Sequence, residues 1–493
     1  MQPMSRRSCS ASGSSSPLAW AGILVLATVL PVAAWTTNDI NLILAVMPTG
    51  VVHQHQMIPM RDGVRLSTYC FLPPGHAATS YPVVLVRSAY NDWNQRATYA
   101  NDVVNQSNPT NYTWINTSGY VYVFQDLRGD GESETNANFE PRLSDNEVLD
   151  TYDAVESLAT NAWCNGRVGT YGSSGHGIAA YMGWFSGAPH LVVAAPGNTA
   201  PNLHQHWSFE NGARRWIYQW LQYRYPNNAV MPTWPKPTLG EYYTNSSWQK
   251  ILSSGPVSNR TILLAGDTWH NYMLDSTFET LASLTTGNLA YLTMDPGTHQ
   301  GNTSSNGLVF PKKPSTILNL PNVFQILDGA PFTNTPLLKY FVMGDARRAN
   351  ADGNFYRFAA SWPPPAVRVP YYLHADGRLA PEAPTSTTDS LSYAYHPTNP
   401  VPTVGGNFSF GFGNPSGPLN QLVPQLTGRT DILRFETAPF TNAVEIAGTL
   451  AATLYVSTDV EDSAFVVKLV DLYPAEGTNA AYHAIMRESA ILG

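Results

Sequence analysis

The stretch VGTYGSSGHG, residues 168–177, decides the fold of this chain. An extended run ends at Tyr171, a glycine-rich turn follows, and small and apolar residues from Ile178 onward begin a helix. Ser174 lies in the turn, where a sharp strand-to-helix connection exposes a serine hydroxyl above a sheet. The alternative interpretation is a flexible Gly-Ser surface turn, so a catalytic role for Ser174 depends on partner residues elsewhere.

Length and composition indicate a globular protein of two or three domains. The chain has 493 residues, of which 43% are hydrophobic and 12% aromatic. Its formal net charge is -8, only 13% of its residues are charged, and no run of lysine and arginine is present. Because a nucleic-acid surface requires such basic runs, we expect no nucleic-acid partner.

The N-terminal residues 1–34 have the pattern of an export signal. Arg6 and Arg7 precede an apolar run over residues 17–34, which ends in small residues. This order predicts a cleaved signal peptide and a secreted protein with no membrane association after cleavage, and the alternative is a signal-anchored ectodomain. Glycosylation sequons agree with export and predict a glycoprotein; they begin at Asn105, Asn111, Asn116, Asn245, Asn259, Asn302 and Asn407.

Cysteine content excludes a disulfide framework. Cys9 would leave with the signal, and the mature chain would keep only Cys70 and Cys164. These two form either one bridge or two buried free thiols.

No metal site or cofactor is predicted. Two His-x-His pairs, at residues 53–55 and 204–206, have no third ligand nearby in the sequence. Structural zinc sites need four ligands, so neither pair suffices alone.

The first three quarters of the chain alternate strand and helix patterns, which predicts a mostly parallel, doubly wound α/β sheet. Aromatic residues crowd the region from residue 201 to 250, and we interpret it as a helical cap, with the aromatics either lining a pocket or forming the core of the cap. The expected strands are residues 57–72, 82–87, 120–124, 262–265 and 289–292, and the expected helix is residues 146–158.

Short strands separated by Gly, Pro, Asn and Thr replace this pattern beyond residue 365. They predict an antiparallel sandwich or jelly roll. The expected strands are residues 371–373, 391–395, 444–446, 449–456 and 464–470.

A serine nucleophile needs a base within hydrogen-bond distance and a group that orients the base. His299 follows the apolar run over residues 289–292 in the loop DPGTHQG, where a base is expected in the chain order Ser, acid, His. His176 and His270 also flank the predicted site and are alternative bases, although neither follows the expected strand.

Several ordered motifs resemble the CocE/NonD hydrolases, relatives of cocaine esterase, α-amino acid ester hydrolases and X-Pro dipeptidyl-peptidases. The resemblance runs from about residue 57 to the C-terminus. It implies an α/β-hydrolase domain over residues 53–350 with a helical cap at about 201–255, and a jelly-roll domain over 366–493. The motifs are MRDGVRL (60–66), VLVRSAY (84–90), DLRGDGESE (126–134), WCNGRVG (163–169), PGTH (296–299) and PVPTVGG (400–406).

Site residues follow from the same resemblance. Ser174 matches the family nucleophile, His299 the general base, and Tyr90 the tyrosine that stabilises the oxyanion together with the backbone N–H of Gly175. Gly175 departs from the family pattern, which usually has tyrosine after the nucleophile.

The acid of the triad is the larger departure. The family's Gly-Trp-Tyr-Asp stretch aligns best with residues 269–271, which places Asn271 where aspartate is expected. In the serine proteases, the equivalent Asp-to-Asn change costs about 10⁴-fold in turnover because the imidazole adopts the wrong tautomer. Asp267 is the nearest carboxylate that could orient His299 instead, and Asp275 is a second candidate.

The sequence therefore predicts a secreted serine hydrolase that cleaves small-molecule esters or amides, or short peptides in the manner of an X-Pro dipeptidyl-peptidase, through an acyl-enzyme. Glu210 among the aromatics could hold a substrate's α-amino group. The alternative, based on Asn271 and Gly175, is a catalytically impaired secreted protein whose cap or jelly roll binds a ligand such as a glycan. The last 25 residues resemble the middle of the family's jelly roll, which predicts a truncated domain with an exposed edge strand.

Overall fold

The computed structural model describes residues 37–88, 119–135, 145–199, 201, 209–211, 213–215, 260–282, 284, 289–299, 307–311, 320–332, 337–386, 388–407, 416–461 and 463–492. The predicted signal segment, Tyr90 and most of the predicted cap lie outside these residues.

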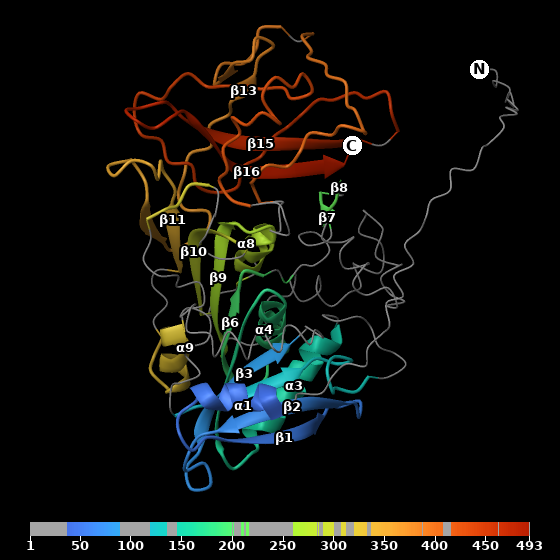
Figure 1. Ribbon diagram of the computed structural model, residues 1–493, viewed down its shortest axis with the longest axis vertical. Coiled ribbons are helices and arrows are strands. Elements are labelled where there is room, and N and C mark those ends of the chain that lie inside the picture. Colours follow the sequence, from blue (N-terminus) through green and yellow to red (C-terminus); the bar gives the residue numbers. More distant parts are fainter. Residues whose placement is uncertain are drawn as a thin grey trace, which may run out of the picture.

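Within the described residues, a ten-stranded sheet forms the centre of the fold (Figure 1). In the spatial order of the sheet, the seven strands from β4 to β11 run parallel, whereas the pairs β1–β2, β2–β4 and β11–β12 are antiparallel. The predicted mostly parallel α/β sheet is therefore confirmed. In spatial order the strands are β1 (Val52–Pro59), β2 (Arg65–Leu72), β4 (Val121–Asp126), β3 (Tyr81–Ser88), β5 (Cys164–Ser173), β6 (Leu191–Gly197), β9 (Ile262–His270), β10 (Ala290–Thr298), β11 (Leu338–Val342) and β12 (Phe355–Ala359).

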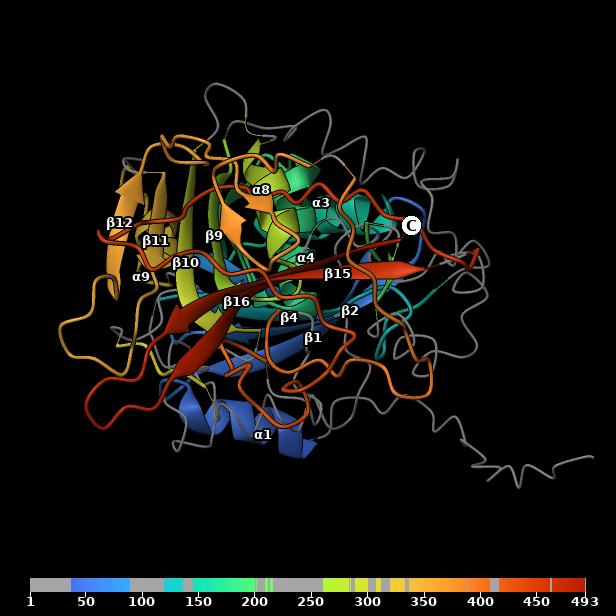
Figure 2. The same cartoon turned by 90° about the horizontal axis from the view of Figure 1, so that it is seen from above.

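Helices cover both faces of the sheet, because its central strands are apolar on both sides. On β3, Val84 and Val86 face one hydrophobic cluster, while Val83 and Leu85 face another. The first cluster includes α1 (Thr37–Val46) and α9 (Leu320–Leu327), and the opposite face carries α3 (Asp145–Ala159), α4 (Gly175–Ser186) and α8 (Leu274–Ala282). Figure 2 shows α1 and α3 on opposite sides of the strands.

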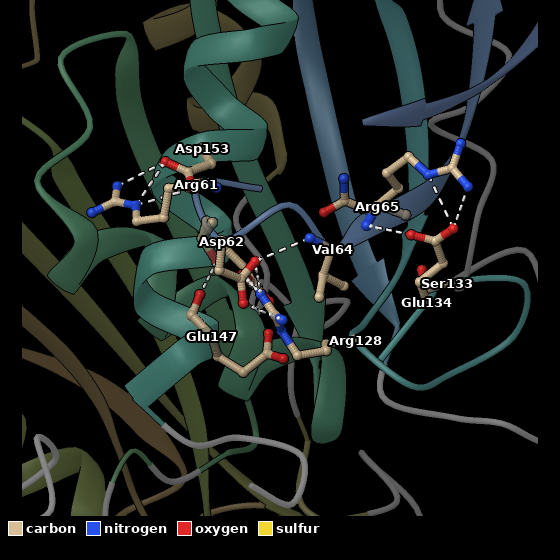
Figure 3. Close-up of polar contacts among 12 residues, drawn as sticks. Arg61, Asp62, Val64, Arg65, Arg128, Ser133, Glu134, Glu147 and Asp153 are labelled. Atoms are coloured by element: carbon tan, nitrogen blue, oxygen red, sulfur yellow. Dashed lines mark hydrogen bonds and ion pairs between the residues drawn. The ribbon is translucent and has the colours of Figure 1, made fainter. Parts of the chain in front are cut away.

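Two of the quoted sequence motifs, residues 60–66 and 126–134, are joined to each other and to α3 by charged side chains (Figure 3). Arg128 is the centre of this network: it donates to Asp62 at 2.6 Å and to Asp150 of α3 at 2.6 Å. Its side chain is 4% exposed and that of Asp150 is 2% exposed. Arg61 pairs with Asp153 of α3 at 2.7 Å, but its own side chain is 47% exposed.

We expect Arg128→Met to lower the free energy of unfolding by about 3–5 kcal/mol, because it leaves the buried Asp150 carboxylate without its cation. The matched variant Arg61→Met breaks an exposed pair and should cost less than about 1 kcal/mol. Urea unfolding followed by tryptophan fluorescence measures both. Equal effects of the two substitutions would contradict this account of the network.

The C-terminal part is a β domain of antiparallel pairs, as predicted. β13 (Tyr372–Leu373) pairs with β14 (Leu379–Ala380), and β15 (Ala464–Tyr473) pairs with β16 (Tyr482–Leu492). The strand predictions for residues 391–395, 444–446 and 449–456 were wrong: all of these residues are described and none forms a strand. Apolar composition favours strands only where a partner backbone lies alongside, and these runs remain exposed.

The described part of the predicted helical cap is an antiparallel hairpin of β7 (Phe209–Glu210) and β8 (Ala213–Arg214).

Several sequence expectations are tested by single side chains. Cys70 and Cys164 are buried free thiols. Asn407 is buried and its side-chain oxygen accepts a hydrogen bond from the Glu488 N–H, so this sequon is closed to a glycan in the folded chain. Within the described residues, no helix combines the length and the apolar character needed to cross a membrane.

Candidate active site

Three side chains meet at the carboxyl edge of the parallel strands. Ser174 follows β5, Asn271 follows β9 and His299 follows β10. These strands belong to one parallel set, with β6 between β5 and β9 and with β10 next to β9. Because parallel strands end at the same edge, residues far apart in the sequence are brought together there, as is usual for sites in open α/β sheets.

The turn at Ser174 is the sharp strand-to-helix connection predicted from residues 168–177. Ser174 has φ 56° and ψ -125°, a conformation that non-glycine residues rarely adopt. Gly172 and Gly177 are required by space: a Cβ on Gly172 would lie 2.5 Å from the backbone carbon of His176, and one on Gly177 would lie 2.8 Å from Thr199 Cγ2. The flexible-turn interpretation is wrong, because packing holds the serine in place.

A chain of hydrogen bonds runs from the serine into the protein interior. Ser174 Oγ lies 3.0 Å from His299 Nε2, and His299 Nδ1 lies 2.9 Å from Asn271 Oδ1. Asn271 Nδ2 in turn donates to Asp267 Oδ1 at 2.7 Å. Both candidates for the orienting residue therefore take part: Asn271 contacts the base, and Asp267 lies one step behind it.

Asp267 determines which way the Asn271 amide faces. An ionised carboxylate only accepts hydrogen bonds, so it requires the NH₂ group of Asn271 on its side. The amide oxygen then faces His299 and accepts the Nδ1–H, which leaves the lone pair on Nε2 to accept the Ser174 hydroxyl proton. This is the tautomer that the reaction needs, and it is the one lost when an unsupported asparagine replaces the acid of a serine-protease triad.

Asp267 is held rigidly in the interior. Its Oδ1 also accepts from the Thr268 N–H at 2.7 Å, and its Oδ2 accepts from Thr277 Oγ of α8 at 2.6 Å. Burial raises the pKa of Asp267 to about 7, against the opposing effect of these hydrogen bonds. The carboxylate is therefore fully charged only above neutral pH.

His299 is buried, and Tyr272 packs on it with 5.0 Å between ring centroids. Burial lowers the pKa of His299 to about 3. The side chain that touches its Nδ1 is a neutral amide rather than a carboxylate, so no adjacent negative charge opposes this effect. The imidazole is therefore neutral, and able to accept a proton, over the whole physiological range of pH.

Comparisons with known proteins identify related hydrolases. The model of the X-Pro dipeptidyl-peptidases (S15 family) matches residues 62–250, and the model of their C-terminal non-catalytic domain matches residues 330–492. The cocaine esterase of Rhodococcus sp. (strain MB1 Bresler) is 26% identical over 502 residues, which cover 88% of this chain and 83% of that protein. The chain is a serine hydrolase of the S15/CocE family.

Solved structures show the same fold. An aminopeptidase from a marine sediment Thaumarchaeota archaeon superposes with a TM-score of 0.74 at 21% identity, covering 91% of this chain and 82% of that one. An α-amino acid ester hydrolase superposes with a TM-score of 0.72 at 23% identity, covering 95% and 85%. Both support an α/β-hydrolase fold with a C-terminal β domain for this S15/CocE hydrolase.

The other predicted site residues have different roles. Asp275 forms an ion pair with Arg487 at 2.7 Å, so the prediction that it orients His299 was wrong. Glu210 pairs with Arg215 and accepts from Ser489 Oγ at 3.0 Å, so its charge is already matched within the protein.

Gly175 is the first residue of α4, and its position next to Ser174 suits the predicted oxyanion role of its N–H. Tyr90 lies outside the described residues. The alternative bases His176 and His270 are buried, with pKa values lowered by burial to about 3 and about 4. Of these three histidines, His299 is the one whose Nε2 lies at 3.0 Å from Ser174 Oγ, so the geometry favours His299 as the base.

Sequence reasoning missed the residues that support the site. Thr277 was missed because nothing in the sequence relates it to Asp267, ten positions earlier on another element. Asn198 was missed as well: it has φ 44°, and its side chain donates to the His299 carbonyl at 3.4 Å. The sequence signal for Asn198 was its place directly after the strand β6, next to the predicted nucleophile strand.

Asp267→Ala should reduce kcat of this hydrolase by about 10²- to 10⁴-fold, because Asn271 is then free to turn its NH₂ group toward His299. The isosteric Asp267→Asn keeps an oxygen for Asn271 and Thr268 and should lose about tenfold or less at pH 8. Ester hydrolysis by the purified variants gives both numbers. Full activity of Asp267→Ala would exclude any role for Asp267.

The same residue sets the expected pH dependence. As the pH falls through about 7, Asp267 gains a proton and loses the charge that supports a protonated His299 in the transition state, so kcat should fall with a midpoint near pH 7. Protonation of His299 itself, with its pKa near 3, does not contribute in this range. The side chain in the Asp267→Asn variant does not titrate, so this variant should show no fall in kcat near pH 7. A fall that persists in Asp267→Asn would show that another group causes it.

Proposed function

We propose that this hydrolase cleaves carboxylic esters through a covalent acyl-enzyme on Ser174. The observation that carries the proposal is the continuous hydrogen-bond chain from Ser174 through His299 and Asn271 to Asp267, beside a strained turn that packing holds in place. A serine, a base in contact with it and an oriented base are the elements that nucleophilic acyl transfer requires.

Each residue has a defined role in the proposed reaction. Ser174 Oγ attacks the ester carbonyl carbon while His299 Nε2 takes its proton, and the carbonyl oxygen becomes an oxyanion. The Gly175 N–H, at the positive end of α4, and the Tyr90 phenol expected from the resemblance stabilise that charge. His299 then gives the proton to the departing alkoxide. Water attacks the acyl-enzyme with the same base, and the acid is released.

Esters are favoured over amides by the character of the base. With a neutral amide against its Nδ1 and a pKa near 3, His299 is a weaker base than one that touches a carboxylate directly. Esters have a more reactive carbonyl and a better leaving group than amides, so they need less assistance. The Rhodococcus relative is named as an esterase, which supports the same choice.

The pairing of Glu210 disfavours a substrate with a free α-amino group. Glu210 was the sequence candidate for binding an ammonium group, and its carboxylate is paired with Arg215 and bonded to Ser489. A dipeptidyl-peptidase or an α-amino acid ester hydrolase needs a free carboxylate for the substrate ammonium. The pairing of Glu210 therefore supports simple esters as substrates.

The catalytically impaired binding protein is the weaker alternative. It was based on Asn271 and Gly175. Asn271 has a carboxylate behind it that restores the orientation it lacks alone, and Gly175 retains the backbone N–H that the oxyanion needs. Export, inferred from residues 1–34, completes the proposal of a secreted esterase.

Labelling with a fluorophosphonate, together with a substrate panel, tests the proposal. The wild-type protein should be labelled and should hydrolyse p-nitrophenyl esters of simple acids faster than phenylglycine methyl ester or Gly-Pro-p-nitroanilide. Ser174→Ala should abolish labelling and reduce kcat by about 10⁴-fold or more. A folded wild-type protein that is not labelled and turns over none of the esters would refute the proposal in favour of the binding protein.

A further inference from the structure

The strand β16 of the C-terminal domain lies against the loop that carries Asn271. Figure 1 shows β16 next to the ends of β9 and β10, and three contacts join the two parts. The Ile485 carbonyl lies 3.4 Å from His270 Nε2. Arg487 donates to the Trp269 carbonyl at 3.5 Å and to Asp275 Oδ1 at 2.7 Å. Arg487 thus bridges the two ends of the segment from residue 269 to residue 275.

A second arginine holds the same segment from the other side. Arg215 donates to the Tyr272 carbonyl and forms an ion pair with Glu210. Glu210 accepts from Ser489 Oγ of β16, and Asn211 donates to the β16 carbonyl of Ala490 at 3.0 Å. The hairpin β7–β8 is therefore fastened to β16 as well.

Arginine contacts therefore lie on both sides of Asn271 along the chain. The carbonyls of Trp269 and Tyr272, on either side of the pair His270 and Asn271, each accept from a guanidinium group. Two elements, β16 and the hairpin β7–β8 that is fastened to it, thereby hold the backbone of the segment that presents Asn271 to His299. A shift of about 1 Å in such a segment is enough to cost about 10²-fold in rate.

Charges around Asp267 add an electrostatic effect to this mechanical one. Burial raises the pKa of Asp267, and the positive charge of Arg487 on β16 opposes that rise. The other groups that face Asp267 are Thr277 of α8, Tyr181 of α4 and Asn271, with His299 of β10 beyond Asn271. None of these four carries a positive charge at neutral pH.

We propose that Arg487 is a positioning residue of the active site, through which the C-terminal domain keeps Asn271 aligned with His299. This inference rests on the proposed esterase function. Arg487 acts through the Asn271 segment and does not belong to the groups that touch substrate. Its side chain is 21% exposed and that of Asp275 is 43% exposed, so this ion pair contributes little to stability. Loss of this ion pair should therefore lower kcat while the melting temperature stays nearly unchanged.

The test is the kinetic analysis of Arg487→Gln with p-nitrophenyl esters. We expect kcat to fall about 10- to 100-fold with KM nearly unchanged, and the acid limb of the kcat profile to move to higher pH, because Asp267 loses a favourable cation. Arg487→Lys keeps the charge and should leave the acid limb in its wild-type position while restoring part of kcat. Asp275→Asn removes the same ion pair from its other side and should lower kcat in the same direction.

Arg347→Gln is the matched control. Arg347 also joins the two domains: it donates to the Ala480 carbonyl and packs on the rings of Tyr473 and Tyr482. It makes none of the contacts with the segment 269–275 described above. We expect this variant to keep both the wild-type kcat and the wild-type acid limb.

Three results would overturn the inference. Wild-type kcat and pH profile in Arg487→Gln would show that Arg487 does not position Asn271. Equal changes in Arg347→Gln would assign the effect to general docking of the C-terminal domain. A wild-type protein that is neither labelled by fluorophosphonate nor active on esters would instead refute the proposed function, and this inference with it, so the two failures are distinguishable.

Discussion

The buried hydrogen bond from Asn271 to Asp267 is the interaction on which the site depends. Without it, an asparagine beside the catalytic histidine can turn either way, and one of the two orientations gives the inactive tautomer. With it, the acceptor-only carboxylate fixes the amide, and the amide fixes the imidazole. Thr268 and Thr277 hold the Asp267 carboxylate in place. The arrangement of the site therefore depends on the end of β9 and the first turns of α8.

This arrangement costs stability. The unfolded chain ionises Asp267 near pH 4, whereas the folded chain does so near pH 7. Between these values the unfolded state binds fewer protons, so this residue makes unfolding easier as the pH rises. A charge that destabilises the fold but supports the reaction is typical of functional sites. A triad with an aspartate in direct contact with the histidine does not need this additional buried residue. Here the amide of Asn271 stands between His299 and the carboxylate of Asp267.

The sequence predicted the catalytic domain well because its elements carry strong periodic patterns. The apolar strands of the parallel sheet, the helix near residues 146–158 and the turn at Ser174 all form as expected. The C-terminal strands were predicted less well, since apolar runs such as residues 449–456 carry no information about which backbone pairs with them. At the site, the pairing of Ser174 as nucleophile with His299 as base was predicted from their motifs and from their order in the chain.

The relation of Asn271 and Asp267 did not follow from the sequence. They are four residues apart at the end of a strand, and either alone could have been the partner of His299. Only their placement in space shows that they act in series. The contributions of Thr277, Asn198 and Arg487 were equally invisible, because each comes from an element remote in sequence and is recognised by contact alone.

The tautomer of His299 is the most direct test of the hydrogen-bond chain that runs from Ser174 to Asp267. Histidine-specific ¹⁵N labelling and NMR at pH 8, with His299 assigned by substitution, distinguish a proton on Nδ1 from one on Nε2. We expect the Nδ1–H form in the wild-type protein and a mixed or Nε2–H population in Asp267→Ala. An Nε2–H wild-type histidine, or an Nδ1–H form that persists unchanged in Asp267→Ala, would contradict this hydrogen-bond chain.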